Sequence, residues 1–438
     1  MSKLNDNKWG NICERVDTCA LTGAGAFIAG IPNAEIIVNG PLWCYFYALR
    51  YLEHGEYDMA QRFHGSQPDN NAVVYGSEKY LLDALERLLQ SNSRPELLFI
   101  ESSCSMSLIG DDLNGIAGKA DLPFPFVTMD CGGMLGGFAE GFIKAAIKVF
   151  DKFLLQDVVR EANTVNILGQ SSFYLNGTSD SLELQRLLSA GGYKVQAMPG
   201  AGSSLADIKL LGKAALNIVT NEELGLSLAK YLEQRFGTPY ILAGLPYGIN
   251  GTISWLQKIN AVLPASHMNV LKQEAARTRD YLVSLVNDIS CNWGRLWFDQ
   301  VVVSAPPTVA LCMAQAVREE WADMGKLTVI CQRRLPQKNP SAYCTIADII
   351  LTAGVDDIVL KDIANEKDSV LLLGSSSETS LLYRYKHNNF ISCNIAYPIQ
   401  DEVFMLQQPV TGLKGSMYML QRLWNAYISD FLHRQARV

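Results

Sequence analysis

Three cysteines in the N-terminal part of the sequence have the residue type and the surroundings of iron–sulfur ligands. Cys19, Cys44 and Cys104 each lie beside glycine or at the end of a short apolar run. The intervals between them are much longer than those of a local zinc knuckle. Thiolates that meet among glycines suit an iron–sulfur cluster, because glycine lets the backbone approach the cluster closely. A single free cysteine is more often a small buried hydrophobic residue, but three in such contexts favour ligands.

The elements expected before two of these cysteines would bring them together. The apolar run Leu97 to Ile100 lies between a proline and small polar residues, which is typical of a buried parallel strand. A second apolar run, Ile36 to Val38, precedes Cys44. In open α/β sheets, ligands bind outside the carboxyl ends of the strands. We therefore expect Cys44 and Cys104 to meet at one edge of a sheet.

The cysteines belong to a longer series of motifs. In order, the series is Cys19, Gly40-Pro41-Leu42-Trp43-Cys44, Val73-Val74-Tyr75-Gly76, Cys104 and Ile109-Gly110-Asp111-Asp112. This order resembles the nitrogenase component 1 family. That family includes the subunits of the molybdenum-iron protein, scaffolds that assemble its cofactor, and nitrogenase-like reductases of tetrapyrroles and of carbon–sulfur bonds. The resemblance extends from about residue 15 to residue 430 and is strongest before residue 135.

The resemblance implies that Cys19, Cys44 and Cys104 hold an iron–sulfur cluster at a subunit interface. Three thiolates are one fewer than a cubane cluster usually takes, so a further ligand must come from elsewhere. Six cysteines from two chains could hold a P-cluster of the 8Fe-7S type, and a shared 4Fe-4S cluster is the smaller alternative. Cys131, in a glycine-rich turn, is another candidate ligand, although such a turn also serves simply as backbone that needs positive φ.

The same resemblance implies an oxidoreductase that works with other chains. We expect a homologous component 1 subunit as partner, in a heterodimer paired into a heterotetramer, with a homodimer as the alternative. We also expect an ATP-hydrolysing iron protein as electron donor, because this sequence has no nucleotide-binding motif. The alternative function is a scaffold for assembling a nitrogenase-type cofactor.

Two ligands of the iron–molybdenum cofactor have no counterpart here. The segment 218–222 contains no cysteine where that ligand is expected, and His387 lies in a turn that looks solvated. The chain therefore resembles the partner-type subunit more than the cofactor-bearing one. A cleft between its domains could still hold a substrate or a different cofactor.

Composition narrows the class of protein further. The chain has 438 residues, 48% of them hydrophobic and 18% charged, which is typical of a globular protein with a large core. The formal net charge of −7 argues against nucleic acid or an anionic membrane as a partner. The N-terminus has no signal-peptide core and no apolar run is long enough to span a membrane, so we expect a cytoplasmic protein.

Strand-like and helical patterns alternate along the chain in three successive parts. This alternation predicts an α/β protein of three doubly wound, Rossmann-like domains with parallel sheets around a central cleft. We expect a cluster-binding domain at residues 1–160, a second at 161–294 and a third at 295–438, whose C-terminal helix packs back on an earlier domain. The expected strands are Ala72 to Tyr75, Leu97 to Ile100, Pro123 to Thr128, Thr164 to Leu168, Tyr193 to Ala197, Ala215 to Val219, Gln300 to Val303, Leu327 to Ile330, Asp357 to Leu360, Ser369 to Gly374 and Phe390 to Ile395. The expected helices are residues 46–56, 78–90, 138–152, 179–190, 221–236 and 416–433.

Overall fold

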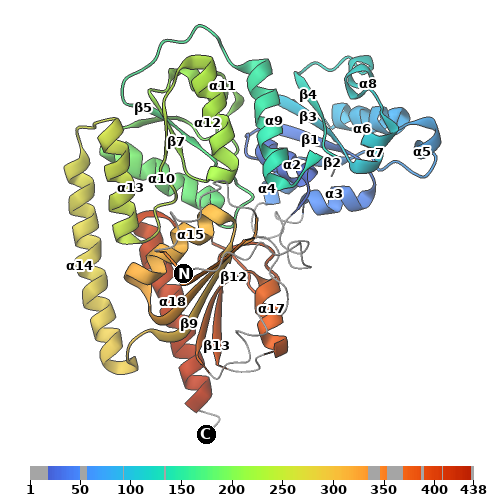
Figure 1. The fold of residues 1–438 in the computed structure, drawn as a ribbon. Coiled ribbons are helices and arrows are strands. Elements are labelled where there is room, and N and C mark those ends of the chain that lie inside the picture. Colours follow the sequence, from blue (N-terminus) through green and yellow to red (C-terminus); the bar gives the residue numbers. More distant parts are fainter. Residues whose placement is uncertain are drawn as a thin grey trace.

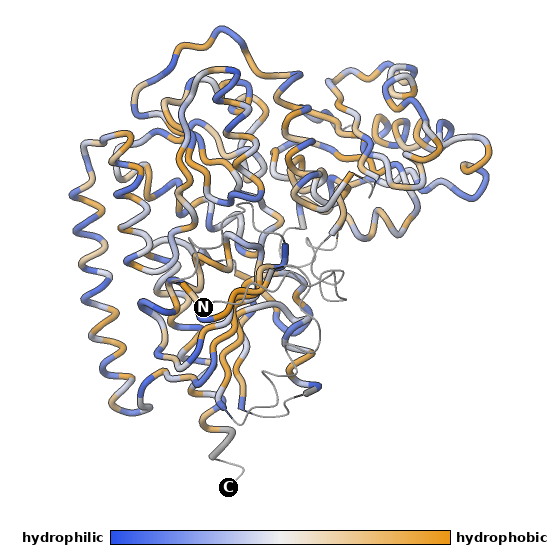
Figure 2. The backbone as a smooth tube through the Cα atoms, viewed as in Figure 1, coloured by the Kyte–Doolittle hydropathy of each residue, from blue (hydrophilic) through white to orange (hydrophobic). Residues whose placement is uncertain are grey.

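A computed structural model describes residues 18–49, 57–91, 93–132, 135–333, 346–352, 368–385, 389–406 and 408–435. These residues form three parallel β-sheets with helices packed on them (Figure 1). The sheets follow one another along the sequence, and the strands at the centre of each are apolar (Figure 2). The predicted α/β class with three parallel sheets is thus confirmed. No helix among the described residues is long and apolar enough to cross a membrane.

The first sheet has the strand order β2-β1-β3-β4. Its central strands β1 (Ala34–Asn39) and β3 (Leu97–Ser102) pair in parallel and are almost wholly buried. The outer strands are β2 (Phe63–Gly65) and β4 (Phe126–Asp130). The helices of this part are α2 (Ala20–Ala29), α3 (Leu42–Leu49), α4 (Tyr57–Ala60), α5 (Ala72–Tyr75), α6 (Glu78–Gln90), α7 (Cys104–Ile109), α8 (Leu113–Lys119) and α9 (Phe138–Phe153).

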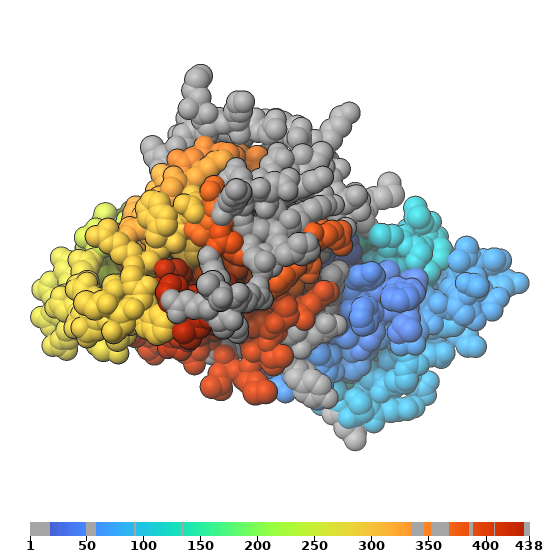
Figure 3. Space-filling model, turned by 90° about the horizontal axis from the view of Figure 1, so that it is seen from below, coloured from blue at the N-terminus to red at the C-terminus, as the bar shows by residue number. Residues whose placement is uncertain are grey.

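The second sheet has the order β6-β5-β7-β8. The strands are β5 (Thr164–Leu168), β6 (Lys194–Ala197), β7 (Leu216–Val219) and β8 (Tyr240–Leu242). The helices are α10 (Gly177–Gly191), α11 (Leu205–Lys209), α12 (Glu222–Phe236), α13 (Gly248–Val262) and α14 (Met268–Trp293), with a short 3-10 turn η2 (Leu211–Lys213). Helix α14 lies along the outside of the molecule, at the end opposite the first sheet (Figures 1 and 3).

The third sheet has the order β11-β10-β9-β12-β13 among the described residues. Its strands are β9 (Trp297–Ala305), β10 (Asp323–Cys331), β11 (Ile349–Thr352), β12 (Val370–Gly374) and β13 (Phe390–Asn394). Helix α15 (Pro307–Ala316) continues into a π-helical turn η3 (Val317–Trp321), and α17 (Ser376–Tyr385) follows β12. The last helix, α18 (Gly412–Gln435), packs against α10 and α13 of the second part.

The structure corrects several sequence expectations. The predicted strand Ala72 to Tyr75 is helix α5, because at the surface its backbone is satisfied locally: Tyr75 N–H donates to Asn71 O (2.9 Å) and Gly76 N–H to Ala72 O (3.0 Å). The predicted strand Pro123 to Thr128 starts later, as β4. The strands β2, β8 and β11 were not predicted. The predicted strand Asp357 to Leu360 lies outside the described residues.

Helices α2 and α9 approach each other through glycine. A Cβ added to Gly23 would lie 1.9 Å from the carbonyl oxygen of Phe138, and one added to Gly141 would lie 1.9 Å from that of Ala20. Both distances are far shorter than any van der Waals contact, so only glycine permits this crossing. The contact holds the first turn of α2 against the first turn of α9.

We predict that Gly141→Ala destabilises the protein by about 3 kcal/mol or more, because a methyl group there must push the two helix backbones apart. Gly118→Ala is the matched control, because Gly118 also lies in a helix but has open space at the Cβ position. At position 118, replacing a helical glycine with alanine should raise the free energy of unfolding by roughly 0.5–1 kcal/mol. Denaturant midpoints of the three proteins measure the effect, and equal midpoints for Gly141→Ala and wild type would contradict it.

Candidate cluster site and interdomain cavity

Cys19 lies immediately before α2 and is exposed. Its backbone forms an isolated antiparallel bridge with Gly137, and the next residue, Ala20, donates its N–H to Gly136 O (3.2 Å). The crossing of α2 and α9 therefore fixes where this thiol lies.

Cys44 and Cys104 follow neighbouring parallel strands. Cys44 is the third residue of α3, after β1, and Cys104 is the first residue of α7, after β3. Ser103 N–H donates to Asn39 O (2.9 Å), which ties the two strand ends together. A Cβ on Gly40 would lie 2.6 Å from the Ser103 side chain, so glycine is needed for the two loops to touch. The expected meeting at one sheet edge is therefore present, although Cys44 lies within a helix.

Electrostatics shows that all three thiols are close. The pKa of the Cys44 thiol is raised, first by burial and then by the neighbouring Cys19 and Cys104. Cys19 and Cys104 are exposed and Cys44 is half-buried, so the three thiols share one surface. A thiol must lose its proton to become a metal ligand, and a bound cation favours the thiolate form of Cys44.

The type and surroundings of the three thiols can be compared with the needs of an iron–sulfur cluster. Among the described residues, no group of three or more His, Cys, Asp or Glu side chains is arranged to hold a single metal ion. In a cluster each thiolate binds its own iron, so the sulfur atoms stand further apart than around one ion. Gly132 adds room, since a Cβ there would lie 3.4 Å from the Cα of Cys104. The donor set and its glycine surroundings therefore fit an iron–sulfur cluster.

Cys131 and Glu101 lie buried beneath this surface. Burial raises the pKa of the Cys131 thiol well above its usual value, and the nearby Glu101 and Cys19 raise it further. Burial also raises the pKa of the Glu101 carboxyl, which is completely buried at the end of β3. Burial therefore disfavours the charged form of both groups. Cys131 as an additional ligand remains a prediction. The sequence analysis missed Glu101, although an acidic residue ending an apolar strand is an available signal.

The Ile109-Gly110-Asp111-Asp112 motif borders the site without entering it. Gly110 ends α7 with φ of +81°, a left-handed conformation that favours glycine. The Asp111 carboxylate accepts hydrogen bonds from the N–H and the hydroxyl of Ser77, both at 2.6 Å. Ser77 in turn accepts a hydrogen bond from the Asn39 amide (2.8 Å) at the end of β1. The motif therefore links α6, α7 and the strand that leads to Cys44.

Two exposed apolar surfaces flank the cysteines. The first, the α3 face, consists of Leu42, Trp43, Phe46 and Tyr47, and Trp43 is 71% exposed. The second, the α5–α7 face, consists of Val73, Val74, Tyr75 and Leu108, and Tyr75 is 83% exposed. Helix α3 lies on the underside of the first part (Figure 1), which faces the viewer in Figure 3. Large apolar surfaces of this kind mark protein–protein contacts.

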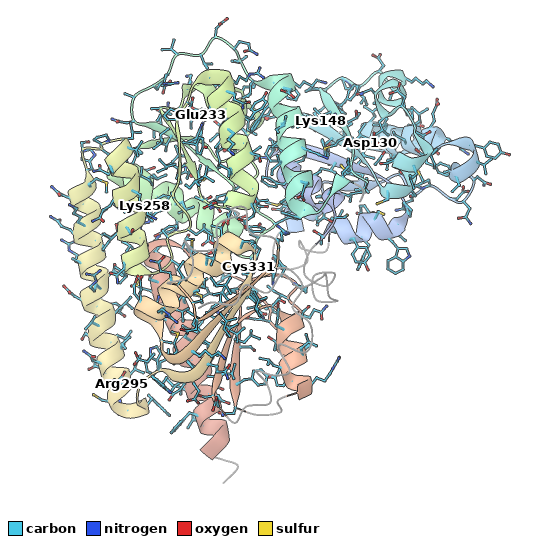
Figure 4. All side chains as sticks on the ribbon, in the orientation of Figure 1. Asp130, Lys148, Glu233, Lys258, Arg295 and Cys331 are labelled. Atoms are coloured by element: carbon cyan, nitrogen blue, oxygen red, sulfur yellow. The ribbon has the colours of Figure 1, made fainter. Side chains whose placement is uncertain are left out.

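A cavity lies where the three sheets meet, near Cys331 in Figure 4. Phe138 of α9, Tyr174 and Asn221 of the second part, and Gln332 and Arg333 of the third part all line it. The Glu378 carboxylate accepts hydrogen bonds from Ser304 Oγ (2.6 Å) and Gln332 Nε2 (3.4 Å), and so holds the end of β10 at the cavity. The predicted central cleft thus contains a defined cavity, but the sequence did not indicate which residues line it.

The buried Asp180 fixes one wall of this cavity. Its Oδ1 accepts hydrogen bonds from Val410 N–H (2.6 Å), Thr411 N–H (2.9 Å) and the Thr411 hydroxyl (3.0 Å). Burial raises the pKa of Asp180 from 3.8 to about 6, against the lowering effect of these hydrogen bonds. Asp180 therefore joins α10 to the loop before α18.

The remaining cysteines and histidines form no second site among the described residues. Cys331 and Cys393 are buried, Cys312 is half-buried, and burial raises the pKa of these thiols to about 12, 11 and 11. Cys291 is exposed on α14. His64 pairs with Glu35 at 2.7 Å. Cys13, Cys344, His54 and His387 lie outside the described residues.

We predict that Asp180→Asn removes part of the pH dependence of stability. A raised folded-state pKa means that Asp180 stabilises most below pH 3.8 and that this contribution is lost as pH rises through about 6. Between pH 4 and pH 7 the wild type should lose about 2 kcal/mol relative to the variant, whose amide oxygen can keep the same three donors. Denaturant titrations at pH 4 and pH 7 measure the free energy of unfolding of each protein. Asp280→Asn, at an exposed position, is the control. Parallel pH profiles for wild type and Asp180→Asn would contradict the prediction.

Comparison with known proteins agrees with this geometry. The family model "Nitrogenase component 1 type Oxidoreductase" matches residues 19–428. A light-independent protochlorophyllide reductase subunit of Nostoc sp. (strain PCC 7120 / SAG 25.82 / UTEX 2576) is 28% identical over 423 residues, which are 90% of this chain and 79% of that protein. The corresponding reductase subunit of Nostoc punctiforme (strain ATCC 29133 / PCC 73102) is 28% identical over 252 residues. These residues are 54% of this chain and 48% of that protein, so the match spans about half the relative's length.

A solved structure shares the fold. "Nitrogenase Cp1 at pH 6.5" superposes with a TM-score of 0.77 at 17% identity, and the match covers 98% of this chain and 95% of that one. Because the family model extends over nearly the whole chain, the protein belongs to the nitrogenase component 1 type oxidoreductase family.

Proposed function

We propose that this chain is a subunit of a nitrogenase-like reductase in which Cys19, Cys44 and Cys104 hold an iron–sulfur cluster at a subunit interface. The observation that carries the proposal is the placement of Cys44 and Cys104 after two paired strands, together with the exposed Cys19, beside the apolar α3 face. Relatives named as reductase subunits favour a reductase over an assembly scaffold.

The chain's own residues would bind and shield the cluster. Cys19, Cys44 and Cys104 would each supply a thiolate, and the glycines around them leave space for the inorganic core. When bound, the cluster supplies one-electron transfer. Burial raises the pKa of Glu101 and of Cys131 beneath it, which disfavours negative charge behind the thiolate set.

A partner chain is needed because three thiolates leave a cluster incomplete. A homologous component 1 subunit would bring further cysteines, either to complete a 4Fe-4S cluster or to build one of the 8Fe-7S type. The α3 face lies directly on the element that carries Cys44, so the partner would cover both the apolar side chains and the cluster. We propose a heterodimer that pairs into a heterotetramer, with assembly and cluster binding thermodynamically linked.

The electron donor would use the second exposed surface. Helix α7 begins at Cys104 and packs on α5, so the α5–α7 face is the apolar surface beside this ligand. Electron transfer requires a short path from donor to cluster, and this face offers one. An ATP-hydrolysing iron protein that docks here would deliver electrons to the cluster, which passes them to a reduction site in the assembly.

We predict that Cys19→Ala, Cys44→Ala and Cys104→Ala each lose most of the iron and acid-labile sulfide of the anaerobically purified complex, because each removes a ligand. Cys291→Ala, an exposed cysteine far from the site on α14, is the matched control and should keep its iron. Full iron and sulfide content in all three variants would refute the ligand assignment.

Electron transfer from the iron protein to the cluster is tested with the same wild-type and variant complexes. Addition of the cognate iron protein, a reductant and MgATP should reduce the visible cluster absorption of wild type and of Cys291→Ala only. Multiple-turnover reduction of an added substrate separates a reductase from a scaffold.

We predict that Trp43→Ala weakens assembly of the complex by at least about ten-fold, because a large aromatic side chain at an interface often contributes about 2 kcal/mol or more. Trp297→Ala is the matched control, since Trp297 is 49% exposed at the start of β9 in the third part. Sedimentation velocity under anaerobic conditions measures the association. A cluster-replete monomer at micromolar concentration would overturn the interface.

A further inference from the structure

A groove lies between the edge strand β2 and helix α6, both in the first part of the chain (Figure 1). Its volume is about 610 Å³, within the roughly 300–1,000 Å³ that is typical of ligand pockets. Helix α6 packs on the sheet face that carries Ile37 and Ile100, whereas α2 packs on the opposite face. No described residue lines both this α6 groove and the central cavity, so the two are separate.

Arg87 brings open hydrogen-bond donors to the α6 groove. Its Nη2 donates to Gly65 O of β2 (3.2 Å), and its guanidinium makes no other hydrogen bond or ion pair with a described residue. Asp83 lies one helical turn earlier, where an acid ordinarily pairs with such an arginine. Here Arg87 reaches across to β2 instead, and no salt bridge joins the two side chains. Arg87 is exposed, so a ligand can reach its remaining donors.

Two acceptors without a partner line the same groove. The exposed Asp83 carboxylate makes no hydrogen bond or ion pair with a described residue. The His64 ring is held through Nε2, which lies 2.7 Å from Glu35 Oε2, and Ser93 Oγ donates to the other oxygen of Glu35 (2.9 Å). A carboxylate accepts, so Nε2 carries the proton and the neutral ring presents Nδ1 as an acceptor. The His64 side chain is 33% exposed, so a ligand can reach it.

Two tyrosine rings complete the walls of the groove. Tyr45 comes from α3 and Tyr80 from α6. The Tyr45 hydroxyl donates to Phe63 O (3.3 Å) and the Tyr80 hydroxyl donates to Asp69, so both rings are held in place. Aromatic walls with a few open polar groups are the usual composition of a small-molecule site.

The open groups define the chemistry of the ligand. A guanidinium binds phosphate or carboxylate through two parallel N–H donors, so Arg87 calls for an acid group. Asp83 and the neutral His64 ring accept hydrogen bonds, so they call for donors such as hydroxyl groups. These acceptors lie on opposite walls, α6 and β2. Hydroxyl groups spread along a ligand therefore reach both acceptors better than a single ammonium group does.

We propose that the α6 groove binds a small polyhydroxylated anion, of the chemical class of sugar phosphates and sugar acids. The acid group binds Arg87, and hydroxyl groups bind Asp83 and His64 Nδ1. This site goes beyond the electron relay and does not depend on it, because none of these three residues belongs to the surface that carries Cys19, Cys44 and Cys104.

Four compounds test the proposal by equilibrium binding to the purified full-length chain. Glucose 6-phosphate and gluconate each carry an acid group and several hydroxyl groups. Glucose lacks the acid, and inorganic phosphate lacks the hydroxylated chain. We expect at least one of the two sugar anions to bind about five-fold or more tightly than both glucose and inorganic phosphate, because each fragment loses contacts to charged or polar groups. Isothermal titration calorimetry measures the affinities, and the tighter sugar anion identifies the acid as phosphate or carboxylate.

Variants on α6 assign each preference to its residue. Arg87→Gln should remove the preference for the sugar anion over glucose. Lys79→Gln is the matched control, because it removes the same charge from an exposed position of the same helix that does not line the groove. Asp83→Ala should remove the preference for the sugar anion over inorganic phosphate. Its matched control is Glu86→Ala, at another exposed position of α6 outside the groove.

Chemical modification of histidine locates the bound ligand without a variant. Diethyl pyrocarbonate modifies accessible imidazole rings, and mass spectrometry measures the extent of modification at each histidine. A saturating concentration of the tighter sugar anion should slow the modification of His64 several-fold. The exposed His267, just before α14, is the internal control and should keep its rate.

Several results would overturn the site. They are no binding of either sugar anion at millimolar concentration, equal affinity for inorganic phosphate and the sugar anions, or an unprotected His64 at saturation. Tighter binding of L-serine than of either sugar anion would show that an ammonium group is preferred to hydroxyl groups, and would also refute the proposal. The wild-type comparisons stand even if a variant fails to fold. No measurement here uses the iron protein or iron content, so failure of this site is distinct from failure of the proposed relay.

Discussion

The close contact between helices α2 and α9 is the constraint on which both sites depend. Gly23 and Gly141 let each helix backbone touch the other, with added Cβ atoms at only 1.9 Å from carbonyl oxygens. The contact fixes Cys19 beside Gly137. It also fixes the next residue, Phe138, whose ring faces the guanidinium of Arg333 at the central cavity. The far end of α2 meets the second part, where Gly202 N–H donates to Gly30 O (2.7 Å). One buried helix therefore connects the cysteine surface to the rest of the molecule.

The surface that carries Cys19, Cys44 and Cys104 has the properties of a site that a second chain would complete. Two thiols are exposed, the third is half-buried, and the adjoining α3 and α5–α7 faces expose large apolar side chains. Glu101 and Cys131 lie buried beneath this surface, and burial raises the pKa of both groups. Apolar area beside exposed thiols is stabilised by association, so the same contact can complete the coordination and remove apolar surface from water.

The junction between the second and third parts is held by buried polar groups rather than by apolar packing alone. Thr308 Oγ1 accepts a hydrogen bond from Glu222 N–H (3.1 Å) and donates one to Glu223 Oε2, so the N-termini of α12 and α15 are joined. Asp180 joins α10 to the loop before α18 in the same way. Such groups tolerate little displacement, because each buried partner must stay satisfied. They give the cavity fixed walls and place Arg333 and Asn221 on opposite parts of the chain.

The sequence by itself determined the α/β class, most strands of the three sheets and the three cysteines, because buried parallel strands are long apolar runs and because the motif order is specific to one family. It could not determine that Val73, Val74 and Tyr75 form an exposed helix, since β-branched residues favour strands only when the surroundings bury them. Nor did it indicate Glu101, Arg333 and Asn221 as site residues. Arg333 and Asn221 lie more than a hundred positions apart in sequence and become neighbours of one cavity only through packing of the second and third parts. Hydrophobic periodicity is a property of a short segment of sequence. Burial, the proximity of the thiols and the walls of the cavity depend on contacts between distant segments, so only the tertiary structure decided them.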